Sequence, residues 1–151
     1  MGMSQAAVEA AIGKGQSVRN RQYYYNNEMA IDYNEDKRVE FIEFLGGIDG
    51  SLRPVIYGDS VFDTCADELA DLLQQKNGEG AVDSEQGYSF FFLNISVGVY
   101  REIRPIDVTE MIEEMKADGI SVENNADIAA EMRKANHWAT IGIGALGYYQ
   151  R

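Results

Sequence analysis

The sequence has few of the residues that form cross-links, metal sites and linkers. Its one cysteine, Cys65, cannot form a disulfide within the chain and fits a reducing compartment. One cysteine and one histidine, His137, are too few for a structural zinc site of the usual type. Only two prolines occur, so no Pro-rich linker divides the chain. We therefore expect a single domain covering residues 1–151, without a metal or a disulfide framework.

Long apolar runs are also missing. The longest nearly uncharged stretch, residues 87–100, is well short of the roughly 20 residues that cross a bilayer. Residues 1–12 contain Glu9 and have neither a positively charged start nor a long apolar segment, so they are not expected to act as a signal peptide. These features predict a cytoplasmic protein that does not enter a membrane.

Positive charge is scarce. Thirteen basic residues stand against 25 acidic ones, which gives a formal net charge of −12. Nucleic acids and anionic membrane surfaces repel such a chain, so neither is an expected partner. A basic protein would be attracted, and its association would be accelerated. The alternative interpretation is that the acidity serves only solubility.

Four segments have the composition and end signals of helices. Ser4 is placed to cap a first helix that Gly13 ends, and apolar residues recur at helical spacing in a second helix from Thr64. Capping-box spacing relates Thr64 to Asp67 and Asp107 to Glu110. The predicted helices are residues 4–12, 64–76, 107–117 and 125–135.

The remaining periodic segments predict strands, mostly in adjacent hairpins. They are residues 29–33, 38–45, 54–57, 88–93, 95–100, 137–143 and 145–149, and residues 14–21 and 78–87 are expected to be loops. Residues 88–100 fit either one long bent strand or a tight hairpin. Helix followed by hairpin occurs near the start and again in residues 64–100. The pattern predicts an α+β fold, with a largely antiparallel sheet and helices packed on one face.

Two features resemble sites of known chemistry. Gly142, Gly144 and Gly147 have the spacing of a dinucleotide fingerprint, but no helix can follow within the remaining residues to receive a pyrophosphate. A bulge or close packing in a terminal strand is the preferred interpretation, and no cofactor is expected. Cys65, at a helix start, could pair with His137 as nucleophile and base, although an inert, buried cysteine is the commoner outcome.

Aromatic residues offer a further interpretation. Tyr23, Tyr24 and Tyr25 form a run beside the first expected hairpin. Tyrosines anchor many protein interfaces and are also ordinary in sheets, so both interpretations stay open.

Several segments together resemble a group of small bacterial proteins. They are residues 39–44, 57–73, 88–101 and 140–149, about two-thirds of the chain from the first hairpin onward. The pattern resembles immunity proteins of polymorphic and contact-dependent toxin systems. The repeated helix and hairpin is also similar to the β-lactamase-inhibitor-like fold. The first resemblance implies a protein that neutralises a toxin by covering its active site or a nearby surface.

The leading hypothesis is an immunity or inhibitor protein, not an enzyme, that binds a basic toxin, a nuclease being one class, through an acidic surface. The expected contact residues are acids clustered in sequence around the strand at 38–45 and the helix at 64–76: Glu40, Glu43, Asp59, Asp63, Asp67, Glu68 and Asp71. The alternatives are a small-ligand-binding domain whose aromatic sheet lines a pocket and a self-associating domain. An enzyme that uses Cys65 or a carboxylate pair is the least favoured.

Overall fold

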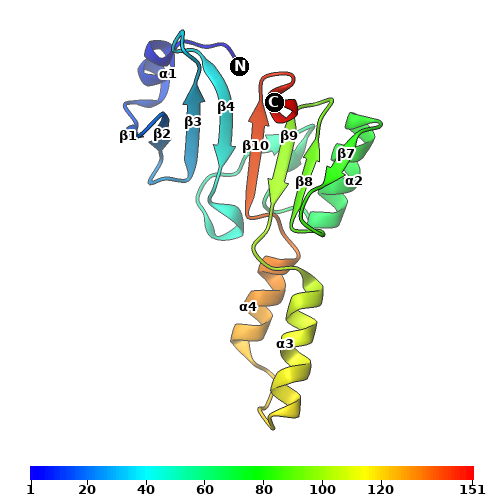
Figure 1. Ribbon diagram of the computed structural model, residues 1–151. Coiled ribbons are helices and arrows are strands. Elements are labelled where there is room, and N and C mark those ends of the chain that lie inside the picture. The colour runs from blue at the N-terminus through cyan, green and yellow to red at the C-terminus, as the bar shows by residue number, and fades with distance from the viewer.

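Eight strands form one antiparallel sheet in the computed structural model, which describes residues 1–151 (Figure 1). The strands are β1 (Gln16–Val18), β2 (Arg21–Tyr24), β3 (Met29–Tyr33), β4 (Val39–Phe44), β7 (Ala81–Asp83), β8 (Ser89–Phe92), β9 (Val97–Tyr100) and β10 (Thr140–Gly144). The helices are α1 (Gln5–Ile12), α2 (Ala66–Asn77), α3 (Pro105–Ala117) and α4 (Ala126–Ala135). A separate two-stranded hairpin, β5 (Val55–Ile56) and β6 (Asp59–Ser60), precedes α2. The predicted α+β class with an antiparallel sheet is confirmed.

The sheet has two similar halves. Its strand order is β1-β2-β3-β4-β10-β9-β8-β7, and each half follows a helix, α1 or α2. The halves meet where β4 and β10 pair antiparallel, with Ile141 opposite Phe44. The repeated helix and hairpin in the sequence therefore corresponds to two helix-plus-four-strand units, with β1 and β7 at the outer edges.

The hydrophobic core lies between the sheet and α1 and α2, which cover the same face. Val8 of α1 packs with the side chains of β2, β3 and β4, while Leu69 and Leu73 of α2 pack with those of β8, β9 and β10. Phe44 contacts both clusters. Leu69 and Leu73 are fully buried, and truncating such a leucine to alanine costs about 2–5 kcal/mol. This burial fixes which side of α2 faces the solvent.

The C-terminal residues fold back over the opposite face of the sheet. Residues 145–149, predicted as a strand, instead form a turn that leads into a short 3₁₀ helix, Tyr148–Gln150, because Gly147 adopts a left-handed conformation. The Tyr148 ring stacks on Phe41 at 4.6 Å, and Tyr149 packs over Gly142. A Cβ atom at Gly142 would lie 2.6 Å from the Tyr149 hydroxyl oxygen. The predicted close packing in a strand is confirmed at Gly142 and Gly144, whereas Gly147 lies in the turn and has no atom near its Cβ position.

Helices α3 and α4 form a hairpin inserted between β9 and β10. In Figure 1 this hairpin projects from one end of the sheet, away from both α1 and α2. We call residues 105–135 the arm. The prediction of helices on one face thus holds for α1 and α2 and fails for the arm, whose two helices pack against each other.

Several predicted boundaries are wrong for identifiable reasons. Cys65, not Thr64, is the N-cap residue of α2, because the Thr64 hydroxyl donates to the Ser60 carbonyl at 2.6 Å. α3 begins at Pro105, so Asp107 sits in its first turn and accepts from the Arg104 backbone N–H.

The two segments predicted as loops contain β1 and β7. Both are short edge strands with polar residues, and pairing with a neighbouring hairpin strand holds them in place. Residues 88–100 form the hairpin alternative, β8 and β9. No helix combines the length and apolar character needed to cross a membrane.

Candidate functional site

Helix α2 presents a row of carboxylates to the solvent. Its buried residues, Ala66, Leu69 and Leu73, recur at helical spacing and turn toward the sheet. Asp67, Glu68 and Asp71 fall between them and are exposed. Two of these acids lie in the first turn, where the helix dipole favours negative charge. The amphipathic pattern that builds the core therefore also positions this acidic row.

Asp59 and Asp63 extend the row ahead of the helix. Asp59 lies in β6, and Asp63 lies in the turn before α2, where its carboxylate accepts a hydrogen bond from the Ser60 hydroxyl at 2.6 Å. Both are exposed. These five acids, Asp59, Asp63, Asp67, Glu68 and Asp71, are called the α2 acidic surface.

Few cations neutralise this surface. Only Asp63 has an ion pair, with Arg53 at 3.4 Å, and both of these side chains are well exposed. The one lysine of α2, Lys76, lies 5.4 Å from the centre of the Tyr57 ring. Asp59, Asp67, Glu68 and Asp71 form no ion pair. The negative charge of the surface is therefore directed toward the solvent.

The net charge of the whole chain comes from two segments. Residues 54–88, which contain the α2 acidic surface, hold eight acidic residues and one basic residue. The arm holds eight acidic and three basic residues. The rest of the chain has nine of each and is formally neutral. An acidity that served solubility alone would not need this segregation.

Glu40 and Glu43, predicted to belong to the same surface, lie elsewhere. Glu43 lies on the face opposite α2, since it sits across from Gly142 while Phe44 and Ile143 point into the core. Glu40 is the extra residue of a β-bulge opposite Tyr33, and its partner Arg151 belongs to the C-terminal turn on that same face. Glu43 accepts a hydrogen bond from Arg21 at 2.6 Å, and Glu40 pairs with Arg151. Asp32 and, to a lesser extent, Glu43 raise the pKa of Arg21. The structure thus brings five of the seven predicted residues around α2 and uses the other two in local ion pairs.

The segments that carry Cys65 and His137 lie side by side. The backbone N–H of Ala66 donates to the Asn136 carbonyl at 2.7 Å, and the Trp138 indole N–H donates to the Ala66 carbonyl at 2.9 Å. The start of α2 is therefore fixed against the base of the arm. Cys65 and His137 form no hydrogen bond with each other, and the His137 Nδ1 atom instead lies 2.6 Å from the Arg133 carbonyl oxygen. The nucleophile and base pair is not assembled in this structure.

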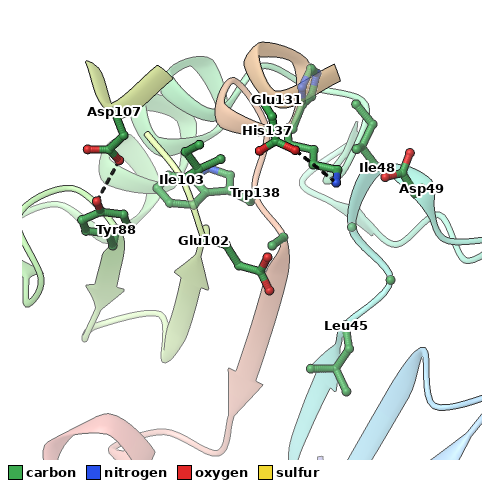
Figure 2. A pocket seen from close by; sticks show the side chains of 14 residues that line it. Leu45, Ile48, Asp49, Tyr88, Glu102, Ile103, Asp107, Glu131, His137 and Trp138 are labelled. Carbon is green, nitrogen blue, oxygen red and sulfur yellow. Dashed lines mark hydrogen bonds and ion pairs between the residues drawn. The ribbon is translucent and has the colours of Figure 1, made fainter. Parts of the chain in front are cut away.

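A cleft of about 560 Å³ separates the base of the arm from the loop after β4 (Figure 2). Its walls include Ile48, Ile103 and the edge of the buried Trp138. Figure 2 shows the Glu102 carboxylate in the open part of the cleft, and Glu102 has no hydrogen bond or ion pair. His137, to which the sequence assigned a possible role as a base, also lines the cleft. The lining comes from segments far apart in the chain, so no sequence motif marks this cleft.

One wall of the cleft is held by a charged network. The Asp107 carboxylate accepts hydrogen bonds from the Tyr88 hydroxyl at 2.7 Å and from the Arg104 backbone N–H at 2.7 Å. The Arg104 guanidinium also pairs with it and lies over the Tyr88 ring. Arg104 and, after it, Tyr88 hold the pKa of Asp107 well below its usual range. These groups satisfy one another and fix the first turn of α3 to Tyr88, the residue just before β8.

Comparisons with models of known families, with characterised proteins and with solved structures find no match to this chain. No three His, Cys, Asp or Glu side chains gather closely enough to hold a metal ion.

Proposed function

We propose that this chain is an inhibitor that binds and neutralises a basic protein through the α2 acidic surface. The observation that carries the proposal is the concentration of carboxylates around α2, of which only Asp63 has an ion pair. Outside residues 54–88 and the arm, the chain is formally neutral. The resemblance to immunity proteins adds that the partner is a toxin, a basic nuclease being one class.

The physical argument rests on where the charge lies. Exposed carboxylates without intramolecular partners produce a field that reaches about 8 Å at physiological ionic strength. Such a field steers a basic partner and raises its association rate, while pairs that become desolvated in the complex slow its dissociation. A protein that works by covering a surface needs no catalytic group of its own.

The test begins with tagged protein in lysate of its source cells, at low and at high salt. Any basic protein retained at a stoichiometric level is then purified, and its enzymatic or toxic activity is measured with increasing amounts of this chain. The proposal predicts loss of that activity at a 1:1 ratio. A retained protein whose activity is unchanged by excess inhibitor contradicts it, as does the absence of any retained basic protein.

The cleft favours small-ligand binding as a second candidate function. Its volume falls within the roughly 300–1,000 Å³ of ordinary ligand pockets, and it combines apolar walls with the free Glu102 carboxylate. A ligand that occupies the cleft raises the melting temperature, because it binds only the folded state. A metabolite panel screened against the wild type and Glu102→Gln, with Glu123→Gln on the arm as the matched control, tests this. A stabilising compound whose effect persists in Glu102→Gln would not be using the cleft carboxylate.

A further inference from the structure

The arm leaves its apolar residues incompletely covered. Of the apolar side chains on its two helices, only Val108 and Ala135 are buried, and both lie at its base. Further out along the arm, six apolar side chains are partly exposed. We call them the methionine row: Met111, Ile112, Met115, Val122, Ile128 and Met132. No other helix or strand packs broadly against α3 or α4. Two helices alone cannot enclose the row between them, and a third helix would complete it.

Methionine is concentrated on this row. Three of the six methionines of the chain, Met111, Met115 and Met132, are half-buried and lie at helical spacing from the buried Val108 of α3 and Ala135 of α4. Methionine is unbranched and polarisable, so it adapts to differently shaped apolar partners and is common on binding surfaces. The row is thus suited to receive an apolar face from another molecule.

Negative charge surrounds the row. Six exposed acids of the arm form no ion pair: Glu110, Glu113, Glu114, Asp118, Glu123 and Asp127. Two of its three basic residues are already engaged, Arg133 with Asp49 and Lys134 with Glu131. A segment that docks here therefore gains from being basic around an apolar stripe.

The sheet does not need the arm. β9 and β10 pair directly with each other, with Thr140 opposite Tyr100 at the point where the arm is inserted. The other half of the sheet joins its last two strands, β3 and β4, through a short turn. The arm is therefore an addition to one of two similar units, and its half-covered row calls for a role outside the fold.

We propose that the arm binds a basic amphipathic helix of the partner protein, which packs as a third helix on the methionine row. This inference rests on the proposed function and names the kind of partner segment that the arm would take. Charge favours this occupant over a second copy of the chain, because two arms would bring like-charged faces together.

The test uses the full-length chain with ¹³C-labelled methionine methyl groups and three synthetic probes. The first probe is an 18-residue Lys/Leu peptide of amphipathic helical pattern. The second has the same composition in a scrambled, non-amphipathic order, and the third is poly-L-lysine of matched charge. Met29, in the core under α1, serves as the internal reference within every spectrum.

The inference predicts that the amphipathic peptide shifts the methyl signals of Met111, Met115 and Met132 in a saturable way and leaves that of Met29 unchanged. The scrambled peptide should bind at least about tenfold more weakly than the amphipathic peptide. Met111→Gln combined with Met115→Gln should weaken amphipathic binding about tenfold as well, because it removes apolar contact without changing charge or helix propensity much. Circular dichroism verifies that the variant keeps its helices.

Two results would overturn the inference, and a third would count against the proposed function alone. In the first, all three probes bind equally and none shifts the methyl signals of the arm. Charge alone would then attract the probes, so the arm would have no binding role, while the proposed function would stand. Arm methyl shifts that depend on protein concentration without peptide, with a doubled mass in sedimentation, would make a second copy the occupant. Failure of the basic partner to bind, with the arm still binding the amphipathic peptide, would count against the proposed function and not against the arm.

Discussion

At the scale of single residues, aromatic rings pack directly against glycines of the sheet. Tyr149 packs over Gly98 and Gly142, next to Phe41 and Phe91. Burial raises the pKa of the Tyr149 phenol. The rings hold the C-terminal turn against the sheet only because the glycines have no side chains.

Gly142→Ala is predicted to destabilise the fold by about 1–3 kcal/mol, because overpacking forces neighbouring side chains to move. The new Cβ would lie 2.6 Å from the Tyr149 hydroxyl oxygen and 2.5 Å from Phe41 Cζ. Urea unfolding measures the effect in the wild-type background and in Tyr149→Ala. The cost should be smaller in the second background, where one of the two clashes is gone. An equal cost in both would show that Tyr149 does not pack there.

Asp107 gives the fold a pH dependence at its acidic limit. Because Arg104 and Tyr88 lower the folded-state pKa of Asp107, the carboxylate stabilises the fold above the pKa of about 3.9 that it has when unfolded. This contribution is lost as the pH falls below about 4. The wild type should therefore melt above Asp107→Asn at pH 7, and the difference should shrink between pH 4 and pH 2. A difference that stays constant down to pH 2 would contradict the assigned pKa shift.

At the scale of elements, the arm is the part of the fold that is least tied to the rest. Its base is held by Trp138, by the Asp107 network and by Arg101, whose guanidinium donates to the Ala135 carbonyl at 3.1 Å. Beyond that base, α3 and α4 rely on each other and on their own end signals. Local opening of the arm should therefore need less free energy than unfolding of the sheet.

Asn125→Ala tests this separation. The Asn125 side chain caps α4 by accepting from the backbone N–H groups of Asp127 and Ile128 at 3.0 and 3.2 Å. Losing a cap of this type costs about 1 kcal/mol. Amide hydrogen exchange should become about fivefold faster in α4 and the outer turns of α3, and stay unchanged in α2 and β10. Equal acceleration in α2 would mean that the arm and the sheet unfold as one unit.

The elements that could be predicted are those with a strong local signal. The strand at Met29–Tyr33 and the capping roles of Ser4 and Gly13 follow from local pattern, and the structure has them as expected. β1 and β7 were missed because each is only three residues long and lies in a polar segment, where only pairing with a neighbour makes it a strand. The C-terminal turn was missed because an apolar, glycine-rich segment reads as a strand, whereas contacts with Phe41 and Phe91 decide its path.

At the scale of the whole molecule, charge is arranged by segment. Proximity in sequence places five of the acids together, because they lie on α2, on the turn before it and on the preceding strand β6. The same reasoning wrongly grouped Glu40 and Glu43 with these acids. Their partners, Arg151 and Arg21, are distant from them in the sequence. Their face of the sheet depends on strand pairing, which no local pattern reveals. The net charge of each segment was the feature of the sequence that could have distinguished residues 54–88 and the arm, which are acidic, from the rest of the chain, which is neutral.

The central claim is that the α2 acidic surface attracts a basic partner. It is tested most directly by the association rate of the purified partner with Glu68→Lys/Asp71→Lys across a range of salt concentrations. Glu35→Lys/Asp36→Lys, which makes the same charge change in the exposed turn between β3 and β4, is the matched control.

The α2 variant should associate about tenfold more slowly at low salt and with a flatter salt dependence, because steering depends on the local field. The control variant should stay within about twofold of the wild type. Equal rates for the two variants at every salt concentration would contradict a binding role for α2.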